Sequence, residues 1–175
     1  MSTPVLTPTS YLVLGCLASA GPSTPYELKQ AVNAGVGFFW SFPHSQLYSE
    51  PVRLAEAGLL HEEREESGRR RRVFSLTDAG HAALRQWLAT PTSELPEIRD
   101  IALLKLFFGA HAEPGQIAGL AAQQREAHRA RLALYEALSQ PADPSPAAAT
   151  LGLGLSFERA AIAFWTTILN DPPTG

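Results

Sequence analysis

The order of elements in the first half of the chain is decided by residues 43–80, PHSQLYSEPVRLAEAGLLHEEREESGRRRRVFSLTDAG. Apolar residues at helical spacing end at Gly58, the residue type that commonly follows a helix C-terminus. Ser67-Gly68 reads as a two-residue hairpin turn, and Thr77 as the N-cap of a further helix. The predicted elements are a helix over 44–57, strands over 59–64 and 69–76, and a helix over 78–89.

Two shorter helices are predicted before this stretch, over residues 11–20 and 25–33. The second begins with Thr24-Pro25-Tyr26-Glu27, which places a capping threonine three residues before a glutamate and a proline at the first helical position. Three helices, a hairpin and a fourth helix are the order of a winged helix-turn-helix. In that fold the third helix enters the major groove of DNA and the hairpin reaches the flanking backbone.

The second half of the chain is helical and poor in strands, with helices predicted over 97–110, 114–139 and 147–170. We therefore predict a mainly α protein with a small β-hairpin. Its expected parts are a winged helix-turn-helix domain (1–90), a polar linker (91–96) and an all-α helical dimerisation domain (97–175).

Several stretches resemble the PadR family of bacterial transcriptional regulators. In the first half they are GPSTPYEL (21–28), PHSQLY (43–48), RLAEAGLL (53–60) and FSLTDAG (74–80). In the second half, RD (99–100), LLKLFF (103–108) and FERA (157–160) are similar to the helical C-terminal dimerisation region of the longer family members. The resemblance implies a homodimer that binds a near-palindromic operator, usually as a repressor, sometimes released by a small aromatic or hydrophobic ligand.

The first turn of the third helix carries the candidate base readers. His44, Ser45 and Gln46 lie there, and Gln46 is the best of them because its amide can bind adenine through two hydrogen bonds. The alternative for His44 and Ser45 is that they cap the helix. Tyr48 either offers its hydroxyl to a phosphate or packs against the second helix. Pro51 costs about 3 kcal/mol inside an ordinary helix, so we expect a kink before it.

Four consecutive arginines, Arg69, Arg70, Arg71 and Arg72, form the densest positive charge in the sequence. With a two-residue turn, glutamates would face them across the hairpin: Glu66 opposite Arg69, Glu65 opposite Arg70 and Glu63 opposite Arg72. The alternatives are a ladder of exposed ion pairs, each contributing at most about 1 kcal/mol, or contact with DNA by one alternating pair, Arg69 with Arg71 or Arg70 with Arg72. Lys29 and Arg53 are weaker phosphate candidates.

The segment around residues 101–108 is apolar nearly all round, more than one neighbouring helix can cover. A second subunit would supply the missing surface. The predicted dimer contacts are Ile101, Leu104, Phe107, Phe108, Phe157, Phe164, Trp165 and Ile168.

Aromatic residues near the predicted domain junction could in addition line a pocket for a small hydrophobic or aromatic effector. The candidates are Phe38, Trp40 and Trp87, for which ordinary core packing is the alternative. A different alternative for the whole protein is a helical interaction module whose winged domain does not read DNA.

Composition excludes several classes of protein. The five histidines show no metal-ligand spacing and no glycine-rich phosphate loop is present, so we expect no enzyme, metal or cofactor.

The longest apolar stretches, 11–20 and 101–110, are too short to span a bilayer, and the start of the chain lacks a basic signal region. With a single cysteine, Cys16, this predicts a cytoplasmic protein. The net charge is -3, yet residues 1–90 are neutral, which leaves DNA as a possible partner.

Overall fold

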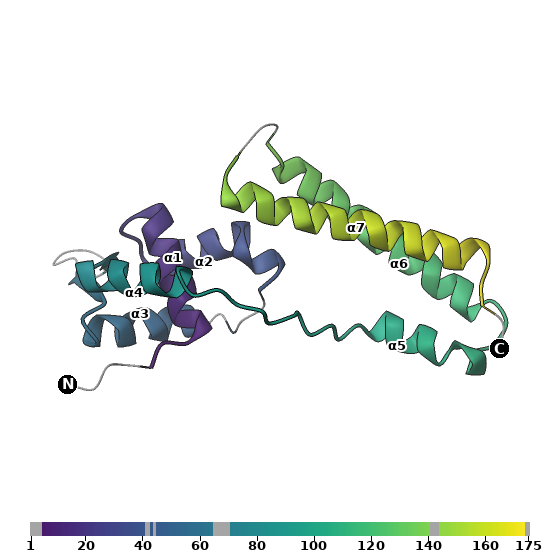
Figure 1. The fold of residues 1–175 in the computed structure, drawn as a ribbon, viewed down its shortest axis with the longest axis horizontal. Helices are drawn as coiled ribbons and strands as arrows, with labels where there is room; N and C mark the ends of the chain where they lie inside the picture. The colour runs from purple at the N-terminus through teal and green to yellow at the C-terminus, as the bar shows by residue number, and fades with distance from the viewer. Residues whose placement is uncertain (1–4, 41–42, 44, 65–70, 141–143, 174–175) are drawn as a thin grey trace. The chain divides into compact units, whose positions relative to one another are not determined.

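The structure is a computed structural model that describes residues 5–40, 43, 45–64, 71–140 and 144–173. The chain forms two compact units, residues 1–94 and 95–175 (Figure 1). The boundary between them falls inside the predicted linker.

The first unit has the predicted order of elements. They are α1 (Pro8–Ala20), α2 (Pro25–Ala34), the short 3-10 helix η1 (Val36–Phe38), α3 (Gln46–Glu56), β1 (Leu60–Arg64), β2 (Arg72–Leu76) and α4 (Asp78–Leu88). This confirms the mainly α winged fold with a small antiparallel hairpin. The predicted N-caps are present: Thr24 accepts a hydrogen bond from the Glu27 amide, and Thr77 from the Gly80 amide.

The core of this unit lies where α1 meets α2, α3 and the hairpin. Its fully or almost fully buried side chains are Val13, Leu14, Leu17, Leu28, Val32, Leu47, Leu54, Leu60 and Phe74. Burial of each such side chain contributes about 1.5–3 kcal/mol. Because Leu47 and Leu54 belong to this core, packing fixes which side of α3 faces outward.

The register of the hairpin differs by one residue from the predicted one. Leu60 lies opposite Leu76, and Arg64 opposite Arg72, so Arg72 does not face Glu63 as predicted. A two-residue turn at Ser67-Gly68 would place Glu63 opposite Arg72, whereas the observed register places Glu63 opposite Val73. Such a slip of one residue sends every side chain to the opposite face of the hairpin. The predicted turn and the predicted partners Glu65 and Glu66 lie outside the described residues. Ser23 adds an isolated bridge to Phe74 at the outer edge of β2.

The second unit is all helical. It contains α5 (Ile101–Phe107), the 3-10 helix η2 (Gly109–His111), α6 (Gln116–Leu138) and α7 (Pro146–Asn170), with α6 and α7 packed side by side (Figure 1). The first of these helices is shorter than predicted. It starts at Ile101 because the Asp100 carboxylate caps it, accepting hydrogen bonds from the Ala102 and Leu103 amides.

Most of the predicted dimer residues are exposed in this unit, but Trp165 is not. Ile101 is 66% exposed and Phe107 81%, and Leu104, Phe108, Phe157 and Phe164 are exposed as well, while Ile168 is half-buried. Trp165 is only 2% exposed and packs with Ala102 and Ala121. The prediction that Trp165 contacts a second subunit is therefore wrong, because its own unit already covers its ring.

Helix α7 also corrects an expectation. By length and composition, this 25-residue helix could cross a membrane, although the sequence pointed only to shorter apolar stretches. Glu158 and Arg159 interrupt its apolar surface, and both pair with α6. Glu158 Oε2 lies 2.5 Å from His128 Nδ1, and Arg159 donates to Glu136 at 3.0 Å. Charged groups inside a lipid-embedded segment are costly, so we interpret α7 as a helix packed against protein.

Candidate nucleic-acid interface

The outward side of α3 begins at Ser45 and continues through Tyr48 and Ser49, one helical turn further on. All three residues are exposed, and Tyr48 is 50% exposed. Leu47 and the fully buried Pro51 lie on the opposite side. The exposure of Tyr48 fits the first of its two predicted roles, contact with a ligand, better than packing against α2. The helix runs unbroken through Pro51.

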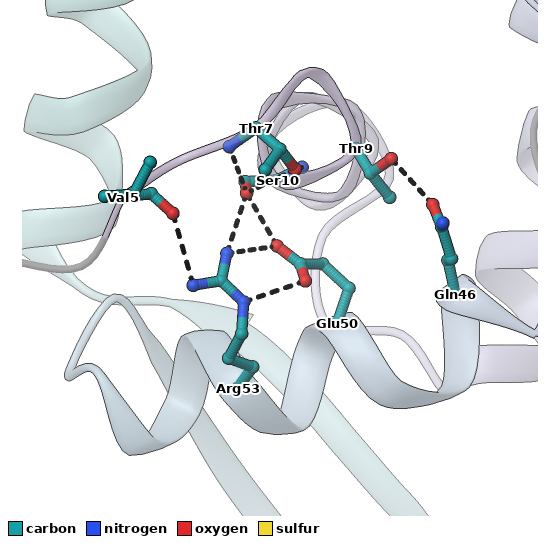
Figure 2. A network of polar contacts seen from close by, with 7 residues as sticks. All are labelled: Val5, Thr7, Thr9, Ser10, Gln46, Glu50 and Arg53. Carbon is teal, nitrogen blue, oxygen red and sulfur yellow. Dashed lines mark hydrogen bonds and ion pairs between the residues drawn. The ribbon is translucent and has the colours of Figure 1, made fainter.

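A second stripe of α3 faces the N-terminus of α1 (Figure 2). Gln46, Glu50 and Arg53 follow one another at helical spacing on this side. Thr9 Oγ1 donates a hydrogen bond to Gln46 Oε1 at 2.9 Å, and Ser10 Oγ donates to Glu50 Oε1 at 2.6 Å. Gln46, predicted to be free for a base, therefore has an internal partner on α1.

Arg53 completes this network. Its Nε and Nη2 atoms donate to the two carboxylate oxygens of Glu50 at 2.9 and 2.6 Å, and Nη1 donates to the Val5 carbonyl at 3.3 Å. Burial by itself raises the pKa of Glu50, but hydrogen bonds from Arg53 and Ser10 outweigh it and hold the pKa below its usual value. Arg53 thus holds α3 against α1, and its predicted contact with a phosphate stays a prediction.

A groove runs from the start of α2, past α3, to the base of the wing. Its lining residues are Thr24, Pro25, Tyr26, Glu27, Gln30, Tyr48, Arg71 and Arg72. We call it the α2–α3–wing groove. Tyr26 and Gln30 are exposed, and Gln30 Nε2 donates to the Tyr26 hydroxyl at 3.1 Å. Sequence reasoning missed both, although polar side chains four residues apart on the outer face of the second predicted helix were a usable signal.

Glu27, the acidic residue in the groove, is hydrogen-bonded to the N-cap residue of its own helix. Glu27 accepts hydrogen bonds from the amide and hydroxyl of Thr24, at 2.8 and 2.9 Å. These bonds lower the pKa of Glu27, and the nearby positive charge of Arg71 lowers it further. The carboxylate therefore serves the cap of α2, while Arg71 remains exposed at the groove's edge.

Arg72 has different surroundings from Arg71. Its Nε and Nη2 atoms donate to Glu62 Oε1 and Oε2, both at 2.7 Å, and its guanidinium lies 5.5 Å from the centre of the Phe74 ring. Hydrogen bonds from Arg72, and then from Arg64, lower the pKa of Glu62 to about 2. This pairing differs from the predicted ladder because Glu62, diagonal to Arg72 on the same face of the hairpin, takes the place of Glu63.

Four further residues were predicted to contact DNA: His44, Arg69, Arg70 and Lys29. His44, Arg69 and Arg70 lie outside the described residues. Lys29 is half-buried on α2.

The aromatic residues predicted for an effector site lie in the first unit. Trp87 stacks on Tyr11, with ring centres 4.7 Å apart and planes 8° from parallel. Trp40 is exposed and Phe38 half-buried. The stack of Trp87 on Tyr11 is the packing alternative for that residue; it leaves the effector prediction untested.

Comparison with known proteins adds independent findings. The family described as "Transcriptional regulator PadR-like family" matches residues 13–86, and "Virulence activator alpha C-term" matches residues 98–171. The negative transcriptional regulator PadR of Bacillus subtilis (strain 168) is 27% identical over 140 residues, covering 77% of this chain and 76% of the relative.

Two solved structures are also similar. The crystal structure of Bacillus subtilis PadR in complex with operator DNA has a TM-score of 0.81 at 22% identity, covering 95% of this chain and 98% of that chain. The crystal structure of the same protein in complex with p-coumaric acid has a TM-score of 0.75 at 22% identity, covering 94% and 97%. At these identities the likeness establishes the shared fold.

Proposed function

We propose that the chain is a transcriptional regulator that binds a double-stranded DNA operator in a sequence-specific way, because residues 13–86 match the PadR-like family of transcriptional regulators. One observation carries this proposal. The polar outward edge of α3 is continuous with a groove that leads to an exposed arginine of the wing.

Each part of this surface has a role in the proposal. Ser45, Tyr48 and Ser49 face the major groove, where hydroxyl groups can contact base edges or phosphates. Tyr26 and Gln30 contact the phosphate backbone from α2, next to the N-terminal amides of that helix. Arg71 neutralises a phosphate beside the wing, and the sequence pattern makes Arg69 a further candidate for a phosphate contact. We also place His44 and Arg70 near the DNA from their positions in the sequence, and Lys29 as a weaker phosphate contact.

The protein acts as a homodimeric repressor in this proposal. The exposed apolar side chains of α5, together with Phe157 and Phe164 of α7, support a second copy as the partner that covers them. A two-fold dimer presents two copies of α3 to half-sites about 34 Å apart, one turn of DNA, which calls for a near-palindromic operator. The relative's description as a negative regulator supports repression. A repressor works on chromosomal DNA, so we place it in the cytoplasm.

A small aromatic effector that releases the operator is part of the same proposal. It is supported by the p-coumaric acid complex of the similar structure and by the exposed Trp40 of this chain. Titration of phenolic acids against tryptophan fluorescence and against operator binding tests it. Unchanged signals in both titrations would reject an effector of this class.

The experiment for the main proposal is selection of DNA sites by the full chain from a random double-stranded pool, followed by sequencing. We expect an inverted repeat whose half-sites are centred about 10 base pairs apart. The same repeat should occur in the DNA upstream of the gene if the protein regulates itself. No enriched motif, together with capture of a protein partner, would favour the alternative of an interaction module.

A further inference from the structure

Gln46 borders the proposed DNA surface, directly after Ser45, and is bound to another residue of its own chain. It occupies the first turn of α3, the part of a recognition helix that reaches base edges. Its Oε1 atom accepts a hydrogen bond from Thr9 Oγ1 at 2.9 Å, from a residue 37 positions earlier in the sequence (Figure 2). The inference drawn from this contact rests on the proposed function and specifies its chemistry.

Thr9 has a fixed place relative to α3. The next residue, Ser10, is completely buried and bonds to both Glu50 and Arg53 of α3, at 2.6 and 2.9 Å. Ser10 also completes the cap of α1, because its Oγ accepts a hydrogen bond from the Thr7 amide at 2.8 Å. These contacts tie the start of α1 to one side of α3, so Thr9 meets the Gln46 amide in a defined geometry.

The contact changes which hydrogen bonds Gln46 can make. A glutamine amide has one oxygen that accepts and one NH₂ group that donates. To bind adenine through two hydrogen bonds, the oxygen must accept from N6 while the nitrogen donates to N7. In this chain the oxygen is turned toward Thr9. Among the described residues the Gln46 Nε2 group has no hydrogen-bond partner, so it is the donor that Gln46 has left to offer.

In the major groove, a lone NH₂ donor distinguishes bases by their exocyclic groups. Guanine presents O6 and N7 and thymine presents O4, which are acceptors, and cytosine presents only an amino donor. Adenine offers N7 to the donor, but its N6 amino group then lacks the amide oxygen that would accept from it. We propose that Thr9 is a positioning residue that makes Gln46 select a keto base, guanine or thymine, in the operator half-site. Adenine, the partner expected from the glutamine alone, is disfavoured while the Thr9 hydroxyl holds the amide oxygen.

The test uses the full-length protein and the operator selected from the random pool. All four base pairs are placed in turn at each half-site position, and Kd is measured for the wild type and for Gln46→Ala. The position read by Gln46 is the one at which Gln46→Ala removes the discrimination. There we expect the wild type to favour guanine or thymine over adenine by roughly tenfold.

Thr9→Val removes the hydroxyl and keeps the shape of the side chain, which frees the amide oxygen. We expect adenine to gain affinity relative to the keto bases by roughly tenfold in this variant. Thr9→Ser keeps the hydroxyl and should retain the wild-type order of preference. A merely structural role of Thr9 would lower the affinity for all four bases equally and leave their order unchanged.

Three results would overturn the inference: a wild-type preference for adenine at the Gln46-dependent position, no position that depends on Gln46, or an unchanged base order in folded Thr9→Val. If Thr9→Val does not fold, the wild-type preference at the position located by Gln46→Ala still decides. Failure of the proposed function is distinguishable, because it would appear earlier as the absence of any selected operator.

Discussion

At the scale of single residues, two neighbouring arginines of the wing differ in their side-chain contacts. Arg71 is exposed beside the α2–α3–wing groove, whereas Arg72 is paired with Glu62 and lies over Phe74. We expect Arg71→Ala to weaken operator binding uniformly across sequences and to reduce the slope of log K against log salt by about 1. Arg71→Lys, which keeps the charge, is the control and should restore the slope. An unchanged slope in Arg71→Ala would remove this residue from the interface.

Glu62 gives the winged unit a pH-dependent contribution to stability. Its pKa is lowered to about 2 in the folded protein, and an unfolded glutamate titrates near about 4.3. The folded state therefore gains stability above the unfolded pKa, and this gain is lost as the pH falls from about 5 toward 2. Because the pair is partly solvated, we expect Glu62→Gln to lose only about 1 kcal/mol of unfolding free energy at pH 7.

Urea unfolding of the wild type and Glu62→Gln at several pH values measures this effect. The difference between the two should shrink as the pH approaches 2. Glu63→Gln is a suitable control because the Glu63 side chain is 74% exposed and its contact with His61 is long, at 3.6 Å. A constant difference across the pH range would show that Glu62 acts through packing instead of charge.

The hydrogen-bond partners of single side chains were the feature hardest to predict from the sequence. The sequence placed Gln46 on the right helix, but its partner Thr9 lies 37 positions away. No local pattern reports such a contact. The internal partners of Arg53 were hidden for the same reason, since Ser10 and the Val5 carbonyl reach it only after α1 has packed on α3.

At the scale of elements, the joint between the hairpin and α4 depends on Gly80. A Cβ atom at this position would lie 2.2 Å from the Leu59 carbonyl oxygen and 2.9 Å from Leu76 Cδ2. We expect Gly80→Ala to destabilise the first unit by about 2 kcal/mol or more, because the backbone of the hairpin would have to move. Thermal unfolding measures the change.

Gly15→Ala is the matched control for Gly80→Ala. It lies inside α1 of the same unit, with no neighbouring atom close to an added Cβ. There alanine should stabilise the helix by about 0.5–1 kcal/mol. Equal effects of the two substitutions would contradict the proposed close contact at Gly80.

The positions of these helices were predictable because the residues that cap a helix are its close neighbours in the sequence. Thr24 with Glu27, and Thr77 as an N-cap residue, predicted the first residues of two helices correctly. The hairpin was found but not its register, because the register depends on the turn geometry. The helix predicted from residue 97 starts at Ile101 instead, since the Asp100 cap was not recognised.

At the scale of the whole molecule, the exposed apolar side chains of the second unit call for a partner copy. We expect the wild type to be a dimer at micromolar concentration in analytical ultracentrifugation, because α5 exposes Ile101, Leu104 and Phe107, and Phe108 directly after it is exposed as well. Replacing Phe107 and Phe108 by serine should shift the protein toward monomer. Leu88→Ser is the control and should leave the dimer intact, because Leu88 is also an exposed apolar residue but lies on α4. A monomeric wild type would contradict the proposed assembly.

The sequence could not tell which apolar residues serve the core of the second unit and which would serve a partner. Trp165 and Phe164 are neighbours on α7, yet one is buried in its own unit and the other exposed. A wide apolar surface on a helix is compatible with either role until α5 and α6 are in place.

The most direct test of the DNA-reading surface is the affinity of the full chain for its selected operator and for random DNA of equal length, measured from 50 to 200 mM salt. A dimer that makes about 6–10 phosphate contacts should lose roughly three to five decades of affinity across this range on both DNAs. At every salt concentration the operator should remain the tighter ligand, and Tyr48→Ala with Ser49→Ala should remove that advantage. Equal affinity for the two DNAs, or binding independent of salt, would contradict the account.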